Sequence, residues 1–206
     1  MKETTKAVFD ELFVRYPSLL NEKDNIADAF KALLDAYRDG GKILVCGNGG
    51  SAADAEHLCG ELLKSFKKRR EIPSSIAMKI RPELAAKLEG ALPAVSLVSM
   101  TGFLSAFAND VSWESAFAQQ VLSLGDERDV LVAFSTSGNS ANCVAAAEVM
   151  KAKGGKVVAL TGSAESKLSQ IADVTIRVGE KETFKVQELH LPVYHALAAA
   201  IEEELF

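Results

Sequence analysis

Four polar side chains, in two pairs far apart in the chain, have the types and spacing needed for metal or proton chemistry. His57 and Glu61 stand four residues apart in a predicted helix, so both side chains lie on one face of it. Gln187 and His195 stand eight residues apart in a second predicted helix, about 80° from each other around its axis. A histidine and a carboxylate on one face can form half of a metal site. Such a pair is also often a plain surface hydrogen bond, so the spacing alone leaves both interpretations open.

The second helix contains a proline that bears on this geometry. Pro192 lies between Gln187 and His195 and cannot donate a hydrogen bond to the Glu188 carbonyl, so a kink there would turn the two side chains toward a shared site. The remaining histidine, His190, lies on a different face from His195. We therefore interpret His190 as structural or exposed.

Two Ser- and Gly-rich segments, 47–51 and 135–140, each follow a short apolar run and precede a predicted helix. Glycine lets the backbone approach a ligand closely, and the free N–H groups at a helix start suit a phosphate. Neither segment matches GxxxxGK[ST] or GxGxxG, and a hydroxyl-rich cradle without a P-loop lysine suits a monophosphate better than a metal-bound triphosphate. The same residues also make ordinary turns, an alternative that is weaker for two loops than for one. The candidate phosphate-binding residues are Asn48, Gly49, Gly50, Ser51, Ser135, Thr136, Ser137 and Ser140.

Short apolar runs alternate with helical patterns along most of the chain, which predicts an α/β fold with a doubly wound parallel sheet. The predicted strands cover residues 42–46, 94–98, 130–134, 156–160 and 174–178. The predicted helices cover 51–66, 140–153, 164–171 and about 184–205, and another helix is expected after the second strand. Both loops fall at the carboxyl ends of strands, where ligands bind in such sheets.

Residues 1–40 are predicted to be helical, and residues 41–206 to form the core of a single domain. Phe9, Phe13 and Tyr16 look exposed on the first helix and suggest an oligomer interface. Residues 66–92 are predicted to be an insertion with a short helix near 83–88. The basic run that begins it is interpreted as a solvated helix end, with attraction of an anionic substrate as the alternative; it consists of Lys64, Lys67, Lys68, Arg69 and Arg70.

Composition excludes several classes of protein. Of the 206 residues, 48% are hydrophobic and 25% charged, as is usual for a globular domain. The net charge of −5 argues against nucleic-acid binding, and no apolar run is long enough to span a membrane. The N-terminal segment lacks the apolar core of a signal peptide, so we expect a cytoplasmic protein. Three scattered cysteines favour buried thiols over disulfides.

The chain resembles the sugar isomerase (SIS) family, and within it the phosphoheptose isomerases. The resemblance runs from about Asp24 onward and is carried by CGNGGS at 46–51, STSGNS at 135–140 and LTG at 160–162. The family's His-x3-Glu and Gln-x7-His patterns are both intact. The insertion at 80–92 is longer than this subfamily leads us to expect, which puts the identity of the sugar in question.

The resemblance implies a flavodoxin-like SIS fold and a homotetramer with sites near subunit boundaries. It implies a divalent metal, usually zinc, surrounded by His57, Glu61, Gln187 and His195. Glu61 and Gln187 would also contact the substrate, as would Asn109 and Asp110, although Asn-Asp also ends helices readily. The expected reaction converts sedoheptulose 7-phosphate into D-glycero-D-manno-heptose 7-phosphate, with Glu61 as base and His195 as acid.

Two other functions remain open at this level. One is a non-catalytic SIS module that senses sugar phosphates or binds proteins, as replication-initiation factors of this fold do. Such a module has no need of the carboxylate at Glu61, which this chain retains. The other is an isomerase for an amino-sugar or hexose phosphate, a class that generally uses other acid–base residues and often carries a second domain.

Overall fold

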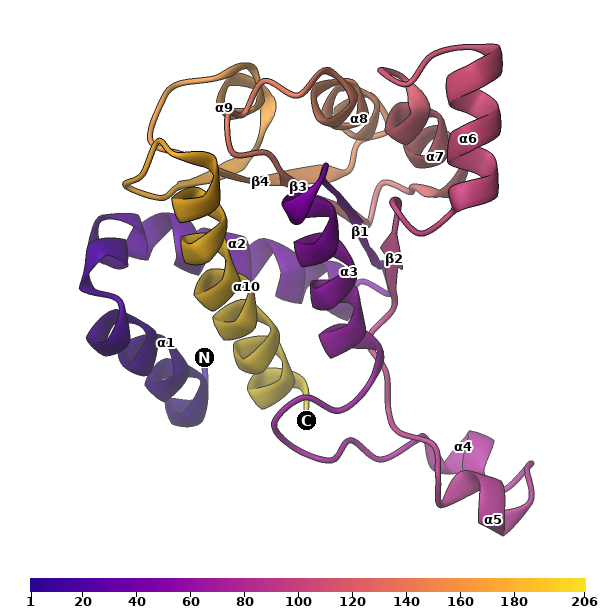
Figure 1. Cartoon of the computed structure of the whole chain (residues 1–206). Helices are drawn as coiled ribbons and strands as arrows, with labels where there is room; N and C mark the ends of the chain where they lie inside the picture. The colour runs from indigo at the N-terminus through magenta and orange to yellow at the C-terminus, as the bar shows by residue number, and fades with distance from the viewer.

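A five-stranded parallel sheet lies at the centre of the computed structural model, which describes all 206 residues (Figure 1). The strand order is β2-β1-β3-β4-β5, the flavodoxin-like order of a doubly wound sheet. The strands are β1 (Ile43–Cys46), β2 (Ala94–Ser96), β3 (Val130–Phe134), β4 (Lys156–Thr161) and β5 (Val174–Arg177). All five predicted strands are present, and β2 is shorter than predicted.

Alternating strand residues enter two separate apolar cores, one on each face of the sheet. In β1, for example, Ile43 and Val45 belong to the larger core, whereas Leu44 and Cys46 belong to the smaller one. Burial on both faces explains why the strands are almost continuously apolar. The larger core is covered by α1 (Glu3–Arg15), α2 (Lys23–Arg38), α3 (Gly50–Leu63) and α10 (Thr183–Leu205). The smaller core is covered by α6 (Thr101–Asp110), α7 (Ala116–Leu124), α8 (Ala141–Ala152) and α9 (Lys167–Ile171). The sequence predicted one helix between β2 and β3, whereas the structure has two, and α7 was not predicted.

The N-terminal helices pack onto the body of the same chain. A short 3₁₀ helix, Pro17–Glu22, connects α1 to α2, and α1 lies along α10 (Figure 1). Phe9 and Phe13 are buried in the larger core, and the ring of Phe9 meets that of Phe30 edge-on at 5.4 Å. The prediction that Phe9 and Phe13 are exposed was therefore wrong, because α10 and α2 cover the apolar face of α1.

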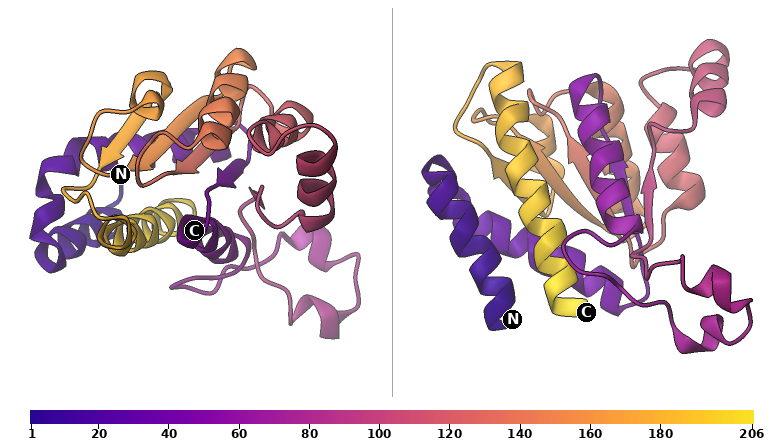
Figure 2. Two further views of the ribbon diagram at one scale, coloured as in Figure 1. Left: turned by 45° about the horizontal axis from the view of Figure 1, so that its top comes forward. Right: turned by 60° about the horizontal axis from the view of Figure 1, so that its bottom comes forward.

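The predicted insertion is present as an arm, residues 71–91, that extends away from the sheet (Figures 1 and 2). It contains two short helices, α4 (Ser74–Ala77) and α5 (Pro82–Ala85), and neither has a buried residue. Hydrogen bonds close its base, from the Arg69 side chain to the Ala86 carbonyl and from Gly90 N to the Arg70 carbonyl. The arm thus lies apart from both apolar cores.

The basic run before the arm is not simply a solvated helix end. Arg70 and Glu202 are both fully buried and form an ion pair of 2.7 Å. The Arg70 guanidinium also donates to the carbonyls of Glu61 and Leu62 at the end of α3, and the Glu202 carboxylate accepts from three consecutive backbone N–H groups, those of residues 66–68. The prediction was wrong for Arg70 because its partner comes from the far end of the chain.

The last helix, α10, runs from Thr183 to Leu205 and continues through Pro192. It packs against both α3 and α1. No helix of the chain, α10 included, is long and apolar enough to cross a membrane. All three cysteines are buried and free, as predicted.

Candidate active site

The two Ser- and Gly-rich loops lie side by side at the switch point of the sheet. They follow β1 and β3, which are neighbours, with Cys46 paired to Ala133 at the carboxyl ends of the strands. Gly49 and Gly138 have φ values of +57° and +65°, a backbone conformation that other residues rarely adopt. The helix α3 begins at Gly50, within the first loop, and α8 begins directly after the second, so two helix N-termini are directed at the same edge of the sheet.

A pair of asparagines joins the two loops. The side-chain amide of Asn48 donates to the Asn142 carbonyl oxygen at 2.9 Å, and the amide of Asn142 donates back at 2.9 Å. Asn48 belongs to the first loop and Asn142 to the first turn of α8. The reciprocal contact fixes the spacing of the loops. It also engages the side chain of Asn48, which was predicted to bind the phosphate.

The hydroxyl groups of the second loop are already partly engaged with one another. Ser135 Oγ and Ser140 Oγ are 2.9 Å apart, and Ser137 Oγ accepts from the Asn139 N–H at 3.1 Å. Thr136 accepts at its backbone oxygen from Gly162 N–H. Ser137 is exposed and Ser135 is buried, so the loop presents its hydroxyls at different depths. An anion bound here would replace some of these internal contacts.

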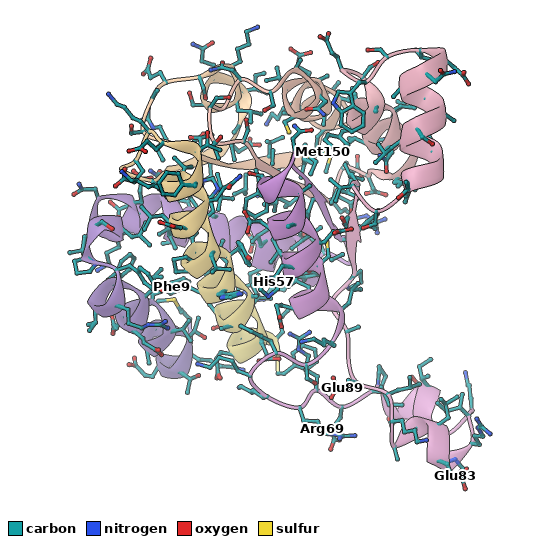
Figure 3. All side chains as sticks on the ribbon, viewed as in Figure 1. Phe9, His57, Arg69, Glu83, Glu89 and Met150 are labelled. Carbon is teal, nitrogen blue, oxygen red and sulfur yellow. The ribbon has the colours of Figure 1, made fainter.

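Two histidines and a glutamate meet where α3 packs against α10. His57 Nε2 lies 3.2 Å from Glu61 Oε1 and 3.4 Å from His195 Nε2, and the two imidazole rings meet edge-on at 4.8 Å. Glu61 also accepts from Lys64 Nζ at 2.9 Å. Figure 3 shows His57 in the space between the two helices. The structure therefore brings together three of the four residues predicted to surround a metal.

Gln187, the fourth predicted ligand, lies over the first loop instead. Its amide donates to Ser51 Oγ at 3.4 Å. A Cβ atom added to Gly50 would come within 2.7 Å of Gln187 Oε1, so a side chain at that position would displace the amide. The contact places Gln187 beside the predicted phosphate-binding residues.

The distances around His57 suit a shared metal ion, although the site is not fully formed. No three His, Cys, Asp or Glu side chains converge as a complete metal site in the structure. Two ligands on one tetrahedral zinc ion, with bonds of about 2.0–2.1 Å, stand about 3.3 Å apart. The separations of 3.2 and 3.4 Å at His57 have this size. The donor types and these two separations thus fit such an ion, and the ion itself remains a prediction.

Two further residues contact the cluster and were missed from the sequence. The Tyr194 hydroxyl lies 2.9 Å from His57 Nδ1 and donates to Asp54 Oδ1 at 3.2 Å. Asp54 stands three residues before His57, on the same face of α3, and this spacing could have identified it. Tyr194 precedes His195 directly and had no comparable signal, because adjacent helical residues point in different directions.

Burial shifts the protonation of several groups near the cluster. It lowers the pKa of His195, an effect reinforced by the neighbouring His57, and it raises the pKa values of Asp54 and Tyr194. His190 is fully buried, with Nε2 3.3 Å from the Thr161 carbonyl oxygen, and burial lowers its pKa to about 4. His190 is therefore structural and neutral, which decides between the two interpretations left open above.

Asn109 and Asp110 lie apart from this cluster. They end α6, on the opposite face of the sheet from α3 and α10, and both are exposed. The Asn109 amide donates to Asp110 Oδ1 at 2.8 Å, and neither side chain has a hydrogen bond to the loops or to the histidines. The structure thus does not bring them to the candidate site, and their contact with substrate remains a prediction.

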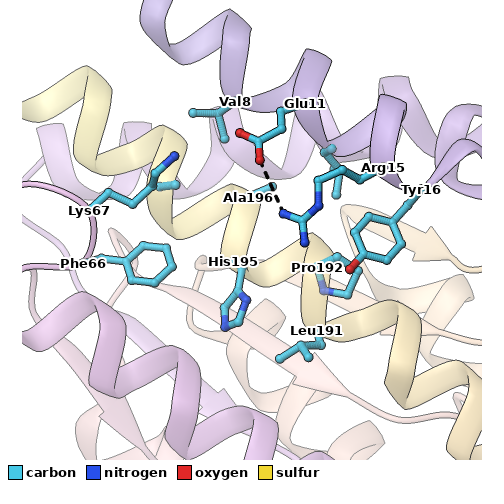
Figure 4. Close-up of a pocket in the computed structure, with 12 residues that line it drawn as sticks. Val8, Glu11, Arg15, Tyr16, Phe66, Lys67, Leu191, Pro192, His195 and Ala196 are labelled. Carbon is cyan, nitrogen blue, oxygen red and sulfur yellow. Dashed lines mark hydrogen bonds and ion pairs between the residues drawn. The ribbon is translucent and has the colours of Figure 1, made fainter.

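A cleft of about 490 Å³ opens beside His195, between α1 and α10 (Figure 4). Arg15, Tyr16, Phe66 and Lys67 line it together with His195. Neither loop contributes to it. His195 thus faces the rest of the cluster on one side and an open, partly basic cleft on the other.

The five-stranded parallel sheet, the helices before it and the paired hydroxyl-rich loops define a SIS domain. Two SIS domain family models match the chain, over residues 98–200 and 18–91. Curated relatives include the phosphoheptose isomerases of Rhodospirillum rubrum, 38% identical over 87% of this chain and 86% of the relative, and of Aneurinibacillus thermoaerophilus, 37% identical over 84% and 78%. The structure of phosphoheptose isomerase GmhA from Neisseria gonorrhoeae matches with a TM-score of 0.76 and 32% identity, covering 98% of each chain. The chain therefore belongs to the phosphoheptose isomerases, a family of sugar-phosphate isomerase enzymes.

Proposed function

We propose that this chain converts sedoheptulose 7-phosphate into D-glycero-D-manno-heptose 7-phosphate by metal-assisted acid–base chemistry. The observation that carries the proposal is the meeting of His57 and Glu61, on the helix that the first loop begins, with His195 of α10. Family membership supports a sugar phosphate as the substrate. The helix α3 thus connects a phosphate cradle to the candidate base, and α10 brings the candidate acid beside it.

The two loops hold the phosphate end of the sugar in this proposal. Backbone N–H groups at the starts of α3 and α8 and the hydroxyls of Ser51, Ser135, Ser137 and Ser140 are available as donors. Binding at the far end of the carbon chain limits the positions that the first two carbons can occupy. The sugar then extends along α3 toward Glu61 and His195.

Isomerisation moves one proton between neighbouring carbons and one between their oxygens. The Glu61 carboxylate removes a proton from carbon 1 of the ketose, and the electron pair forms the double bond of a cis-enediol as the oxygen on carbon 2 gains a proton. His195 then supplies a proton to carbon 2 while the hydroxyl on carbon 1 loses its proton and becomes the aldehyde. The distance of 3.4 Å between His195 and His57 keeps both imidazoles within reach of the same atoms.

His57, Glu61 and His195, together with Gln187, would hold the divalent ion, and zinc is the best match for mixed nitrogen and oxygen ligands. Such an ion, when bound, polarises the carbonyl and hydroxyl oxygens of the sugar. Gln187 contacts Ser51 in this structure, so its amide would connect the cradle to the ligand set.

The test incubates the zinc-loaded protein with a panel of ketose phosphates and follows aldose formation. We expect turnover of sedoheptulose 7-phosphate, and binding without turnover would favour a non-catalytic SIS module.

Glu61→Gln should lower kcat about 10²- to 10⁴-fold while the protein still binds the sugar phosphate. Zinc content separates the two roles of Glu61, because loss of turnover with zinc retained identifies a base. Glu56→Gln is the matched control, since Glu56 is on the same helix and contacts Ser99 instead. Near-normal turnover in Glu61→Gln would overturn the assignment.

We further propose a homotetramer, on the resemblance to the family. The burial of Phe9 and Phe13 within the protomer removes the argument drawn from their exposure. Exposed apolar side chains elsewhere, among them Ile76, Met78 and Trp113, support association between copies. Light scattering should give four times the mass of the chain, and a monomer would contradict the proposal.

A further inference from the structure

A buried ion pair lies at the end of α3, just beyond the residues proposed to do the chemistry. Neither side chain of the pair is exposed, and Arg70 Nε donates to Glu202 Oε1 at 2.7 Å. The two other nitrogens of the guanidinium donate to carbonyls in the last turn of α3, that of Leu62 at 2.6 Å and that of Glu61 at 3.1 Å. Arg70 therefore holds the backbone of the residue that carries the candidate base.

Glu202 makes the corresponding connection to α10. It stands seven residues after His195, about two turns further along the helix, so the two side chains lie on nearly the same face. Its carboxylate accepts from the backbone N–H groups of Phe66, Lys67 and Lys68 at 2.9, 2.7 and 3.0 Å. The segment that follows α3 is thus bound to the helix that carries the candidate acid.

The bound segment places an aromatic ring against His195. The ring of Phe66 lies 5.6 Å from the imidazole, and both residues line the cleft between α1 and α10 (Figure 4). Phe66 also packs against the larger core. The rings of His57 and Tyr194 meet the same imidazole edge-on, at 4.8 and 4.9 Å. A shift of residues 66–68 would therefore remove one of the three rings that hold His195.

Stability alone is a poor explanation for this ion pair. Burying two charges costs free energy that their attraction offsets only in part, so apolar residues of similar volume often stabilise a protein equally well. A guanidinium and a carboxylate differ from apolar residues because their hydrogen bonds have a preferred direction. Here those bonds join three segments, namely the end of α3, residues 66–68 and α10.

We propose that Arg70 and Glu202 are positioning residues that set the separation between Glu61 on α3 and His195 on α10. The inference rests on the proposed function for the roles of Glu61 and His195, whereas the geometry that it describes does not depend on turnover. The ion pair lies about 20 Å from the cradle, because α3 has 14 residues and begins within the first loop. Loss of the pair should therefore reduce turnover and leave phosphate binding intact.

The double variant Arg70→Met with Glu202→Gln removes both charges and keeps an oxygen at position 202 that can accept from the backbone. It should resist urea better than Arg70→Met alone, in which the carboxylate is buried without its partner. We expect the kcat of the double variant for sedoheptulose 7-phosphate to be about 10- to 100-fold below that of the wild type. Its Kd for inorganic phosphate should be unchanged.

Met150→Ala is the matched control, because Met150 is fully buried in the smaller core and its truncation destabilises the protein far from α3 and α10. This variant should keep the kcat of the wild type. A double variant with wild-type kcat would overturn the proposal. The same conclusion would follow if the double variant lost phosphate affinity as strongly as turnover, or if Met150→Ala lost as much kcat, because either result indicates a general loss of structure.

Crystal structures of the metal-free wild type and variants separate this inference from the proposed function. In the double variant we expect the 3.4 Å separation of His57 Nε2 and His195 Nε2 to increase and Phe66 to move away from the imidazole, with no such change in Met150→Ala. If the wild type turns over no ketose phosphate while the double variant shows this displacement, the proposed reaction fails and the positioning role stands. An unchanged arrangement of these three rings in the double variant would refute the positioning role, whether or not the wild type is active.

Discussion

The helices α3 and α8 start in the same way and differ in everything that follows. Each begins after a Ser- and Gly-rich loop at the end of a central strand, and the strands β1 and β3 are neighbours. Along its length α3 carries Asp54, His57 and Glu61 and packs against α10, which adds Tyr194 and His195. By contrast, α8 is mostly alanine and valine and packs against α7 and α9, on the other face of the sheet (Figure 2).

The difference between α3 and α8 shows that phosphate binding and proton transfer have different structural requirements. Phosphate binding requires only helix N-termini and loop donors, which both loops supply. Proton transfer requires titratable groups of suitable acidity in contact with one another, and the imidazoles and carboxylate that meet at the contact of α3 with α10 are such groups, whereas α8 contributes an ion pair of Lys151 with Asp173. The chain thus duplicates the cradle but places the reactive groups only beside the first loop, on α3 and on the neighbouring helix α10. The two sides should also differ in how firmly the rest of the chain holds them.

The largest difference is expected at the C-terminal ends of the two helices. The end of α3 is held by buried Arg70, which pairs with Glu202, whereas Lys153 at the end of α8 donates to the Leu122 carbonyl at an exposed site. Arg70→Met leaves the charge of Glu202 buried and unpaired, so the free energy of unfolding should fall by about 3–5 kcal/mol. Lys153→Met should change it by less than about 0.5 kcal/mol. Urea denaturation measures both, and equal losses would show that the two ends are held alike.

The two left-handed glycines offer a direct comparison of the loops. A Cβ atom on Gly138 would lie 2.1 Å from Ser166 Oγ, whereas Gly49 has nothing within 4 Å. Both alanine substitutions strain the backbone by about 1–2 kcal/mol. Gly138→Ala should cost more, about 2–3 kcal/mol in total, because it also displaces Ser166 from the cap of α9. Thermal unfolding gives the order, and a larger loss in Gly49→Ala would contradict it.

Low pH should destabilise the folded protein through protonation of His190, which is buried on the side of the second loop. This residue packs against Phe134 and Thr161 at the ends of β3 and β4, and burial lowers its pKa to about 4 from an ordinary value near 6.5. As the pH falls, His190 gains its proton in the unfolded chain before it does so in the folded one. The free energy of unfolding therefore keeps its full value above pH 6.5 and decreases as the pH falls toward 4. The slope is at most about 1.4 kcal/mol per pH unit.

His190→Gln tests this interpretation when unfolding is measured across that range. The variant should lack most of the loss between pH 6.5 and 4, whatever its stability at neutral pH. Above pH 8 the wild type and the variant should show the same slope, because His190 is then neutral in both the folded and the unfolded state. An unchanged slope between pH 6.5 and 4 would show that His190 is not the group responsible.

The sequence predicted the sheet well because the three central strands, β1, β3 and β4, are buried almost throughout and are therefore nearly continuously apolar. It also placed His57 and Glu61 on one helix face, since their spacing is local. It failed where the partner is distant in the chain. The burial of Arg70 depends on Glu202, and the burial of Phe9 depends on α10, and neither contact leaves a periodic pattern.

The same reason explains what was incomplete in the site. Contact between α3 and α10 requires two helices more than 100 residues apart in sequence to pack side by side, so only the family resemblance could join His57 to His195. The hydroxyl of Tyr194 was missed because its role depends on the rotamer of a buried side chain. Residues such as Asn109 and Asp110, which were carried over by resemblance alone, have no contact here that tests their role.

The smallest expected effect lies at the contact that couples the two loops. Asn48 and Asn142 exchange two hydrogen bonds of 2.9 Å, so a double-mutant cycle with alanine at each position should show a coupling of about 0.5–1 kcal/mol in the free energy of unfolding. If the loops form one cradle, either single variant should also weaken inorganic phosphate binding as much as the double variant does. Asn139→Ala is the control, because Asn139 is exposed in the second loop and contacts Lys167 rather than the first loop. Additive losses of phosphate affinity in the cycle would mean that the loops bind independently, and that the duplication seen in α3 and α8 represents two sites instead of one.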